Sequence, residues 1–222
     1  MKYIQKNTVP AELTAYKALP GASFIDLIKN HSDIADIVRL SLADEQGYIC
    51  CYCGRQIDGV SHTRIEHIFP KSVPEFKPME LDYENNLLAA CDGGKQERLG
   101  DSSKTAADLY CDEHKHDKII PINPLNPICE SKFLYDENGD IIGIGSDAEV
   151  TISLLNLNSV FLKNRRKAAI NYYVDYPVSD WDAEYARLSK KDSSGRFEEF
   201  CFVLQRYIET FHGKDLKAEV HV

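Results

Sequence analysis

Five of the chain's seven cysteines fall between residues 50 and 111, in a stretch with little periodic apolar pattern. The five are Cys50, Cys51, Cys53, Cys91 and Cys111. A segment of this kind cannot easily build its own hydrophobic core, and a bound metal then supplies folding free energy. The odd number of cysteines and their clustering favour metal ligands over disulfides. The middle of the chain is therefore expected to fold around a metal ion.

The clearest metal-binding pattern is Cys50-Cys51-Tyr52-Cys53-Gly54, a Cys-x-x-Cys pair followed by glycine. Two thiolates in such a tight knuckle can reach one tetrahedral zinc ion. Cys91 and Cys111 can complete a four-cysteine site, because glycines and serines between them allow the chain to loop out. The alternative is that these two are ordinary buried thiols. A redox role for the Cys-x-x-Cys pair is disfavoured, since no apolar strand of a βαβ unit precedes it.

The chain has 222 residues, enough for one core with appendages or for two small domains. It divides into three zones with no internal repeat. Residues 1–45 form an N-terminal helical arm, residues 46–125 contain the cysteine cluster, and residues 126–222 form a mainly helical C-terminal region.

Apolar residues recur at intervals of three and four within the arm, which predicts helices over roughly 23–30 and 33–43. A Pro-Gly turn at 20–21 precedes the first helix, and Ser32 or Asp33 is expected to cap the second. The apolar residues expected on one face of the second helix are Ile34, Ile37, Val38 and Leu42.

The C-terminal zone is predicted to begin with a short hairpin over residues 133–142, because Asn138-Gly139 is a turn signal between two apolar runs. Helices are expected around 158–175 and 196–211. The fold class is therefore α+β and mainly helical.

Acidic residues outnumber basic ones, with 35 Asp and Glu against 26 Lys and Arg, so the net charge is −9. A protein that binds nucleic acid unaided is usually basic, because phosphate neutralisation supplies most of the affinity. No apolar run approaches the about 18 residues needed to cross a bilayer. No secretory signal begins the chain. We therefore expect a cytoplasmic protein without membrane contact, which needs help from a partner to hold nucleic acid.

Glu66 and His67 lie side by side in Arg64-Ile65-Glu66-His67-Ile68-Phe69-Pro70-Lys71, between the two halves of the cysteine set. Adjacent side chains on a strand point to opposite faces. On a bent hairpin, Glu66 can therefore face a metal while His67 faces an attacking water. A Glu-His dipeptide alone is common as a surface pair, and its position between the cysteines is what favours a site.

Two more motifs follow, Asn85-Asn86-Leu87 before Cys91 and Cys111-Asp112-Glu113-His114-Lys115-His116. In this order, the four motifs resemble the HNH endonuclease family over residues 50–116. The resemblance implies a ββα-metal core with a structural zinc ion, flanked here by the two helical regions. It departs from the family in two places, where Glu66 replaces the commoner Asp or His and Asp112 stands at a His/Asn position.

The resemblance implies a role for each residue of the motifs. Zinc would be held by the four cysteines, and His67 would be the catalytic base, with Asn86 orienting its imidazole. Glu66 and Asp112 would hold a catalytic Mg²⁺ or Mn²⁺ ion. If the segment after Cys111 is helical, His116 shares a face with Asp112 and is a further candidate ligand, whereas His114 points away. The residues expected to contact phosphate are Lys71 and Lys115.

Beyond the core, the chain is similar to the HNH proteins that accompany an ATPase in Septu and retron anti-phage systems. The similarity lies in Gln46-Gly47-Tyr48-Ile49-Cys50 after a helical arm, and in the run from Thr151 to Asn158 followed by Leu162 and Arg165. It implies a nucleic-acid substrate, with DNA favoured and RNA possible, and an ATPase partner. The basic run 163–167 is either a contact for this partner or a solvated helix face. The competing hypothesis is a zinc-ribbon binding module without catalytic activity.

Overall fold

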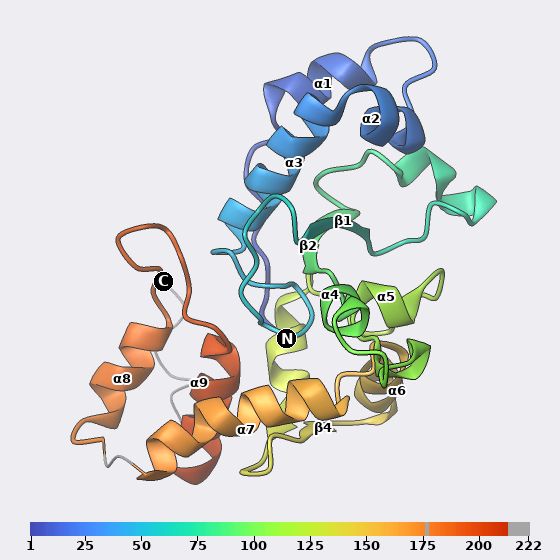
Figure 1. Ribbon diagram of the computed structural model, residues 1–222. Coiled ribbons are helices and arrows are strands. Elements are labelled where there is room, and N and C mark those ends of the chain that lie inside the picture. Colours follow the sequence, from blue (N-terminus) through green and yellow to red (C-terminus); the bar gives the residue numbers. More distant parts are fainter. Residues whose placement is uncertain (176–177, 213–222) are drawn as a thin grey trace.

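The computed structural model describes residues 1–175 and 178–212. Three helices form the N-terminal arm: α1 (Ala11–Lys17), α2 (Phe24–Asn30) and α3 (Ser32–Glu45). They lie together at one end of the molecule, and α3 runs from there towards its centre (Figure 1). Both α1 and α2 pack against α3, which in turn packs against the central sheet. The helical arm is thus attached directly to the middle zone.

The helix α3 forms where the apolar spacing predicts it, but its buried face differs in detail. Ala35, Val38 and Leu42 are fully buried, whereas Ile37 is 37 % exposed. The predicted cap is also wrong: neither Ser32 nor Asp33 caps α3, because the helix begins at Ser32 and its N-cap is a histidine without a side-chain cap bond. The buried face of α3 includes Ala35 in place of Ile37, because an alanine side chain is also apolar and can pack at a close contact.

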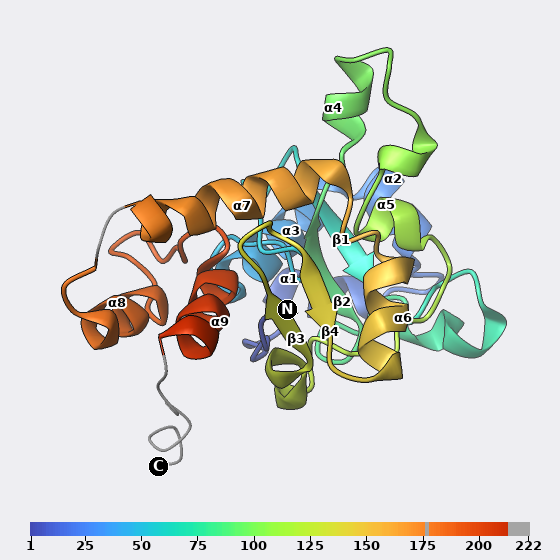
Figure 2. The same cartoon turned by 90° about the horizontal axis from the view of Figure 1, so that it is seen from below.

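The middle zone is organised by a two-stranded antiparallel sheet of β1 (Thr63–His67) and β2 (Leu87–Cys91). Thr63 is paired with Cys91 at one end and His67 with Leu87 at the other. Short helices surround the sheet: η1 (Pro74–Met79), α4 (Lys95–Leu99), η2 (Ala106–Asp108) and α5 (Asp112–Lys115). The segment with α4 projects from the body of the molecule (Figure 2).

Side-chain amides tie the sheet to the end of the arm. The amide of Gln46 accepts a hydrogen bond from Ala89 N and donates one to Ala89 O, each at 2.8 Å, and donates another to Ile49 O at 2.9 Å. Gln46 is only 4 % exposed, so these bonds replace the strand neighbour that β2 lacks on this side. The segment that leads into the first two cysteines is therefore fixed against β2.

The C-terminal zone begins with η3 (Pro127–Lys132) and the predicted hairpin, formed by β3 (Phe133–Tyr135) and β4 (Ile141–Gly143). Its turn contains Gly139 at φ +77°, and a Cβ there would lie 2.2 Å from the backbone oxygen of Lys163, which lies in the later helix spanning Val160–Asp175. Glycine is thus required both by the turn and by close packing.

Four helices complete the described chain: α6 (Ser146–Leu154), α7 (Val160–Asp175), α8 (Trp181–Leu188) and α9 (Cys201–Phe211). The helix predicted at 158–175 is confirmed as α7, which lies across the β3–β4 hairpin (Figure 2). The helix predicted at 196–211 begins only at Cys201, because Phe200 has a left-handed backbone at φ +61°. The helices α1, α6 and α8 were not individually predicted.

The segment just before α9 extends along the first cysteine pair. Phe197 N donates to Gly47 O at 2.9 Å, and Phe200 N donates to Gly54 O at 3.0 Å. One cluster of buried apolar residues draws on all three zones, from Met1 to Ile208. Within the described residues, no helix is both long enough and apolar enough to span a bilayer.

Candidate active site and metal centre

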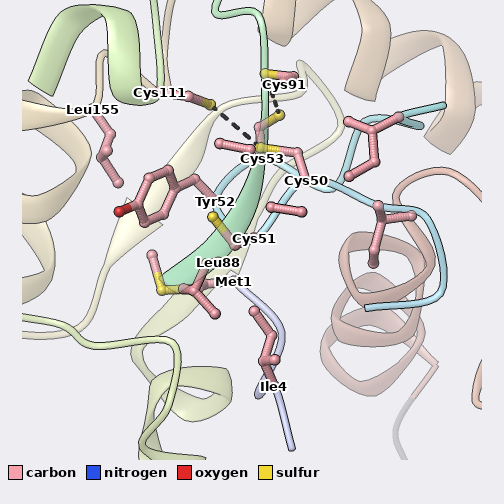
Figure 3. Packing of buried hydrophobic residues seen from close by; sticks show 14 of the residues in the cluster. Met1, Ile4, Cys50, Cys51, Tyr52, Cys53, Leu88, Cys91, Cys111 and Leu155 are labelled. Atoms are coloured by element: carbon pink, nitrogen blue, oxygen red, sulfur yellow. Dashed lines mark hydrogen bonds between the residues drawn. The ribbon is translucent and has the colours of Figure 1, made fainter. Parts of the chain in front are cut away.

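The four cysteines predicted to bind zinc lie together in the structure (Figure 3). Cys50 and Cys53 come from the turn after the arm, Cys91 ends β2, and Cys111 precedes α5. Their sulfurs lie within 4.8 Å of one another, with Cys50–Cys111 and Cys53–Cys91 each at 3.9 Å. Four thiolates around one zinc ion at about 2.3 Å would be about 3.8 Å apart. The four cysteines thus have the spacing of a closed tetrahedral zinc site.

The local backbone brings the sulfurs to one point. Gly54 N donates to Cys50 O at 3.1 Å, and Cys50 N donates to Arg55 O at 2.8 Å, which closes a tight turn with Gly54 at φ +80°. Cys111 has φ +54°, a conformation that non-glycine residues adopt rarely. Strain of this kind fits a ligand whose position is fixed by a bound ion.

The chemistry of the sulfurs also fits a cation. Burial raises the pKa of Cys111 well above its ordinary value, and hydrogen bonds with the neighbouring sulfurs raise it further. Burial acts against ionisation of Cys50 too, but hydrogen bonds from the other thiols outweigh it and hold its pKa well below the ordinary value. One thiolate can therefore be stable in the cluster, while four need a positive ion at their centre.

A second group of polar side chains gathers where β1 ends. Glu66 is 2 % exposed, and its Oε1 accepts hydrogen bonds from Tyr52 Oη at 2.7 Å and from Lys115 Nζ at 2.6 Å. Lys115 Nζ also donates to His67 O at 2.8 Å. With Oε1 held in this way, the Oε2 atom of Glu66 remains for another partner.

Asp112, at the start of α5, lies against Glu66. Burial raises the pKa of Asp112 to about 8, and the negative charge of Glu66 and a hydrogen bond with it contribute to the increase. A buried and a partly buried carboxyl group side by side favour either a shared proton or a divalent cation between them. Hard oxygen ligands of this kind suit Mg²⁺ or Mn²⁺ rather than zinc.

His67 points to the other face of β1, as the alternation along a strand predicts. Its Nε2 lies 3.0 Å from Glu80 O. A carbonyl oxygen only accepts, so Nε2 carries the proton and Nδ1 has the free lone pair. Burial lowers the pKa of His67 to about 4, with Lys71 as the next largest cause, so the imidazole is neutral at physiological pH.

The second ring nitrogen of His67 has no partner among the described residues, although the residue is only 4 % exposed. The hydrogen bond of the ring within the described chain is the one at Nε2, so Nδ1 keeps its lone pair for a further partner.

Asn86 is fully buried and fixes the loop after His67. Its Oδ1 accepts from Phe69 N at 2.7 Å, and its Nδ2 donates to Phe69 O at 3.2 Å and to Met79 O at 2.9 Å. Met79 precedes Glu80, whose carbonyl holds the imidazole. Asn86 therefore acts on His67 through the loop backbone and not through direct contact.

The two remaining histidines of the motif do not gather with the carboxylates. In residues 1–175 and 178–212, the four cysteines are the one group of three or more His, Cys, Asp or Glu ligand atoms. The argument that His116 shares a helix face with Asp112 is wrong, because α5 ends at Lys115 and His116 is exposed at φ +50°. His114 lies with Nδ1 3.0 Å from Leu154 O.

The two lysines predicted to contact phosphate differ in their surroundings. Lys115 is 1 % exposed and its ammonium is fully engaged by Glu66 and the carbonyl of His67, so a phosphate contact does not fit it. Lys71 is exposed and has no hydrogen bond or ion pair among the described residues. Its Nζ lies 5.0 Å from the centre of the Phe24 ring.

Most of the basic run 163–167 serves the fold. Arg166 is 1 % exposed and donates to Gly139 O and to Leu157 O, each at 2.8 Å. Lys163 is paired with Asp140, and Arg165 with Glu199. Asn164, Arg165 and Lys167 remain exposed, so the contact with a partner stays a prediction.

Three groups near the site were not predicted from the sequence: the Tyr52 hydroxyl, the Glu80 carbonyl and the Phe24 ring. Tyr52 lies inside the Cys-x-x-Cys pair. Its position between two cysteines expected to be buried could have predicted that its hydroxyl needs a buried partner. No sequence signal marks a backbone carbonyl 13 residues after His67. The sequence predicts Phe24 only as one apolar residue of an amphipathic helix, without a contact to His67.

Comparison with known proteins identifies one informative relative. No family model matches the chain. A protein of Vibrio cholerae serotype O1 biovar El Tor, named "Retron Vc95 putative HNH endonuclease", is 30 % identical over 205 residues. The alignment covers 88 % of this chain and 95 % of that protein. The similarity thus extends through the arm and the C-terminal region and is not confined to the motifs.

Proposed function

Because the chain belongs to the HNH endonuclease family, we propose that it hydrolyses phosphodiester bonds of nucleic acid, with DNA as the favoured substrate. The unit formed by β1, β2 and α5 would be its ββα-metal core. The observation that carries the proposal is that a neutral histidine with a free Nδ1 follows directly after a buried glutamate that lies against a second carboxyl group.

In this proposal, Glu66 and Asp112 hold the divalent ion. When bound there, Mg²⁺ or Mn²⁺ would stabilise negative charge on the phosphate and on the leaving 3′ oxygen. The four cysteines hold zinc in a closed shell without catalytic work, since no coordination position is left for water.

His67 acts as the general base. Its Nδ1 accepts a proton from the water that attacks phosphorus, while the Nε2–H bond to Glu80 O keeps the ring in the required tautomer. The lowered pKa ensures that the imidazole is unprotonated before the reaction. Lys71, an exposed lysine whose charge acts on the imidazole of His67, supplies a positive charge for the substrate phosphate.

The biological setting proposed for this activity is a retron- or Septu-type anti-phage system with an ATPase partner. The relative's name places that protein in a retron. A net charge of −9 supports the need for a partner, because an acidic nuclease gains little from the phosphate backbone unaided. If the isolated chain bound duplex DNA at nanomolar concentration in physiological salt, this part of the proposal would fail.

The experiment that tests the activity is cleavage of plasmid DNA and of structured RNA with Mn²⁺ or Mg²⁺, by the chain alone and with the product of a neighbouring ATPase gene. His67→Ala removes the base without touching either metal shell. It is expected to keep zinc and fold while cleavage falls by about 10²- to 10⁴-fold. A His67→Ala protein that cuts at the wild-type rate would refute the mechanism. His62→Ala, at an exposed histidine outside the proposed site, is the matched control.

A further inference from the structure

An aromatic side chain of the N-terminal arm contacts the catalytic histidine. The rings of Phe24 and His67 have centroids 4.4 Å apart and planes at 87°, an edge-to-face pair. The same Phe24 ring has Lys71 Nζ 5.0 Å from its centre, within cation–π range. One ring from outside the β1–β2–α5 unit therefore contacts both the proposed base and the proposed phosphate-binding lysine.

The backbone of Phe24 is held by a buried tyrosine. Phe24 is the first residue of α2, and Ser23 caps that helix by accepting from Asp26 N at 3.3 Å. Tyr16 of α1 is 2 % exposed, and its hydroxyl lies 2.9 Å from Ser23 O and 2.8 Å from Asp26 Oδ2. The start of α2 is thus fixed by side chains that do not touch the active site.

Within α2, Phe24 also packs against the core cluster, but it is less enclosed than Leu27. Leu27 is fully buried and packs in the core, whereas Phe24 is partly exposed. A phenylalanine needed only for burial would gain more from a fully enclosed position. The Phe24 ring instead lies between an imidazole and an ammonium group.

The imidazole of His67 is enclosed, because the residue is only 4 % exposed, but it has few polar restraints. Its one hydrogen bond within the described chain runs from Nε2 to Glu80 O, and this bond alone permits the ring to tilt about its direction. The Phe24 ring, whose centroid lies 4.4 Å from that of the imidazole, blocks this tilt. Since Nδ1 must point at the attacking water, the tilt determines whether the base is in reach of the proton.

We propose that Phe24 is a positioning residue for hydrolysis, which holds the imidazole of His67 and the ammonium of Lys71 in their working places. This inference rests on the function proposed above. It makes the arm a part of the active site, so that α2 contributes to turnover although it carries no group that contacts the reacting atoms.

The test compares full-length Phe24→Ala and Phe24→Leu with Ile25→Ala, the neighbouring residue of α2 that is 58 % exposed and serves as the matched control. His67→Ala is the reference for loss of the base. For Phe24→Ala we expect kcat to fall by between about 10- and 100-fold, the effect of a small misplacement of a catalytic group. Zinc content and the unfolding midpoint should stay close to those of Ile25→Ala.

A second readout does not depend on turnover. Long-range ¹⁵N–¹H correlation spectra report which imidazole nitrogen of His67 carries the proton. The wild type and Ile25→Ala should show the Nε2–H form with a single set of ring signals. In Phe24→Ala the Nε2–H form should persist, because its bond to Glu80 O is untouched, but the ring signals should broaden or split as the imidazole tilts. A purely structural role for Phe24 would lower stability without changing this signature.

The outcomes separate the two proposals. If His67→Ala is inactive but Phe24→Ala matches Ile25→Ala in kcat and in the ring signals of His67, the positioning role is wrong and the nuclease assignment stands. A higher kcat in Phe24→Ala would mean that the ring shields the site, which also overturns the positioning role. If Phe24→Ala fails to fold, Phe24→Leu decides, because it fills the volume but lacks the aromatic face. An active His67→Ala protein would remove both proposals.

Discussion

Lys115 and Glu66 form an ion pair at 2.6 Å that is almost completely shielded from solvent, with side-chain exposures of 1 % and 3 %. Lys115 ends α5 and Glu66 lies near the end of β1, so the pair joins the two elements that carry the proposed ion ligands. The lysine that motif position suggested for phosphate binding therefore serves to set the distance between helix and sheet.

Lys115→Met is expected to destabilise the protein by about 3–5 kcal/mol, because it leaves the buried Glu66 carboxylate without its positive partner. Urea unfolding measures this. Lys95→Met breaks the more exposed pair with Glu113 and should cost at most about 1 kcal/mol. The double variant Lys115→Met/Glu66→Gln should recover much of the stability but none of the ion binding. Equal effects of the two lysine substitutions would contradict the structural role of Lys115.

Purified protein should contain about one zinc ion per chain by elemental analysis. Cys53→Ser should lose the ion and unfold the middle zone, because metal binding there is folding free energy. Cys129→Ser is the matched control, a fully buried cysteine outside the cluster. A stable, zinc-free wild type would show that the four sulfurs pack without metal.

Binding of Mn²⁺ at Glu66 and Asp112 should strengthen as pH rises towards 8. The pKa of Asp112 is raised to about 8, so at pH 7 the carboxyl is mostly protonated and must release its proton to the ion. Affinity should increase by about tenfold per pH unit below 8 and level off above it. Calorimetry in buffers of different ionisation enthalpy counts the released proton.

The same shift has a consequence for the ion-free protein. The folded pKa of Asp112 lies above its unfolded value near 3.8, so this group contributes stability at low pH that is lost as pH rises to about 8. Asp112→Asn should remove both the proton release and this pH dependence while it keeps zinc. An Mn²⁺ affinity that stays flat between pH 6 and 9 would argue against Asp112 as a ligand.

Lys71→Ala should weaken nucleic-acid binding and reduce the slope of log affinity against log salt concentration by about one, the loss of one phosphate contact. Fluorescence anisotropy with a labelled duplex over a salt series measures both. Lys29→Ala removes an exposed lysine of α2 and leaves the slope unchanged if the contact is specific. An unchanged slope in Lys71→Ala would assign the phosphate contact to another group.

The gathering of the four cysteines was predictable, because their spacing along the chain limits how this segment can fold. If four sulfurs bind one ion, the Cys50–Cys53 pair must lie beside Cys91 and Cys111, however the chain between them is folded. The alternation of Glu66 and His67 across β1 was predictable for a similar reason, since the period of a strand is fixed. At these positions the local geometry decides where the side chains point, and tertiary contacts change it little.

Other parts depended on contacts that no local pattern encodes. The place of His116 follows from α5 ending after a single turn, which the sequence Asp112 to Lys115 does not announce. The burial of Lys115 depends on β1 lying beside that turn. The contact of Phe24 with His67 joins residues 43 positions apart, and only the packing of the arm against the sheet creates it.

The pairing of β1 with β2 has a ligand of the proposed zinc site at one end, where Cys91 faces Thr63, and the proposed base at the other, where His67 faces Leu87. A slip of one residue would turn every side chain of β1 to the opposite face. It would also move Cys91 away from the other sulfurs, and the proposed zinc site would lose a binding free energy of about 10–16 kcal/mol. Zinc binding at these sulfurs would therefore select the correct strand register during folding. A chain with the wrong register would lack both the complete metal site and a correctly placed base.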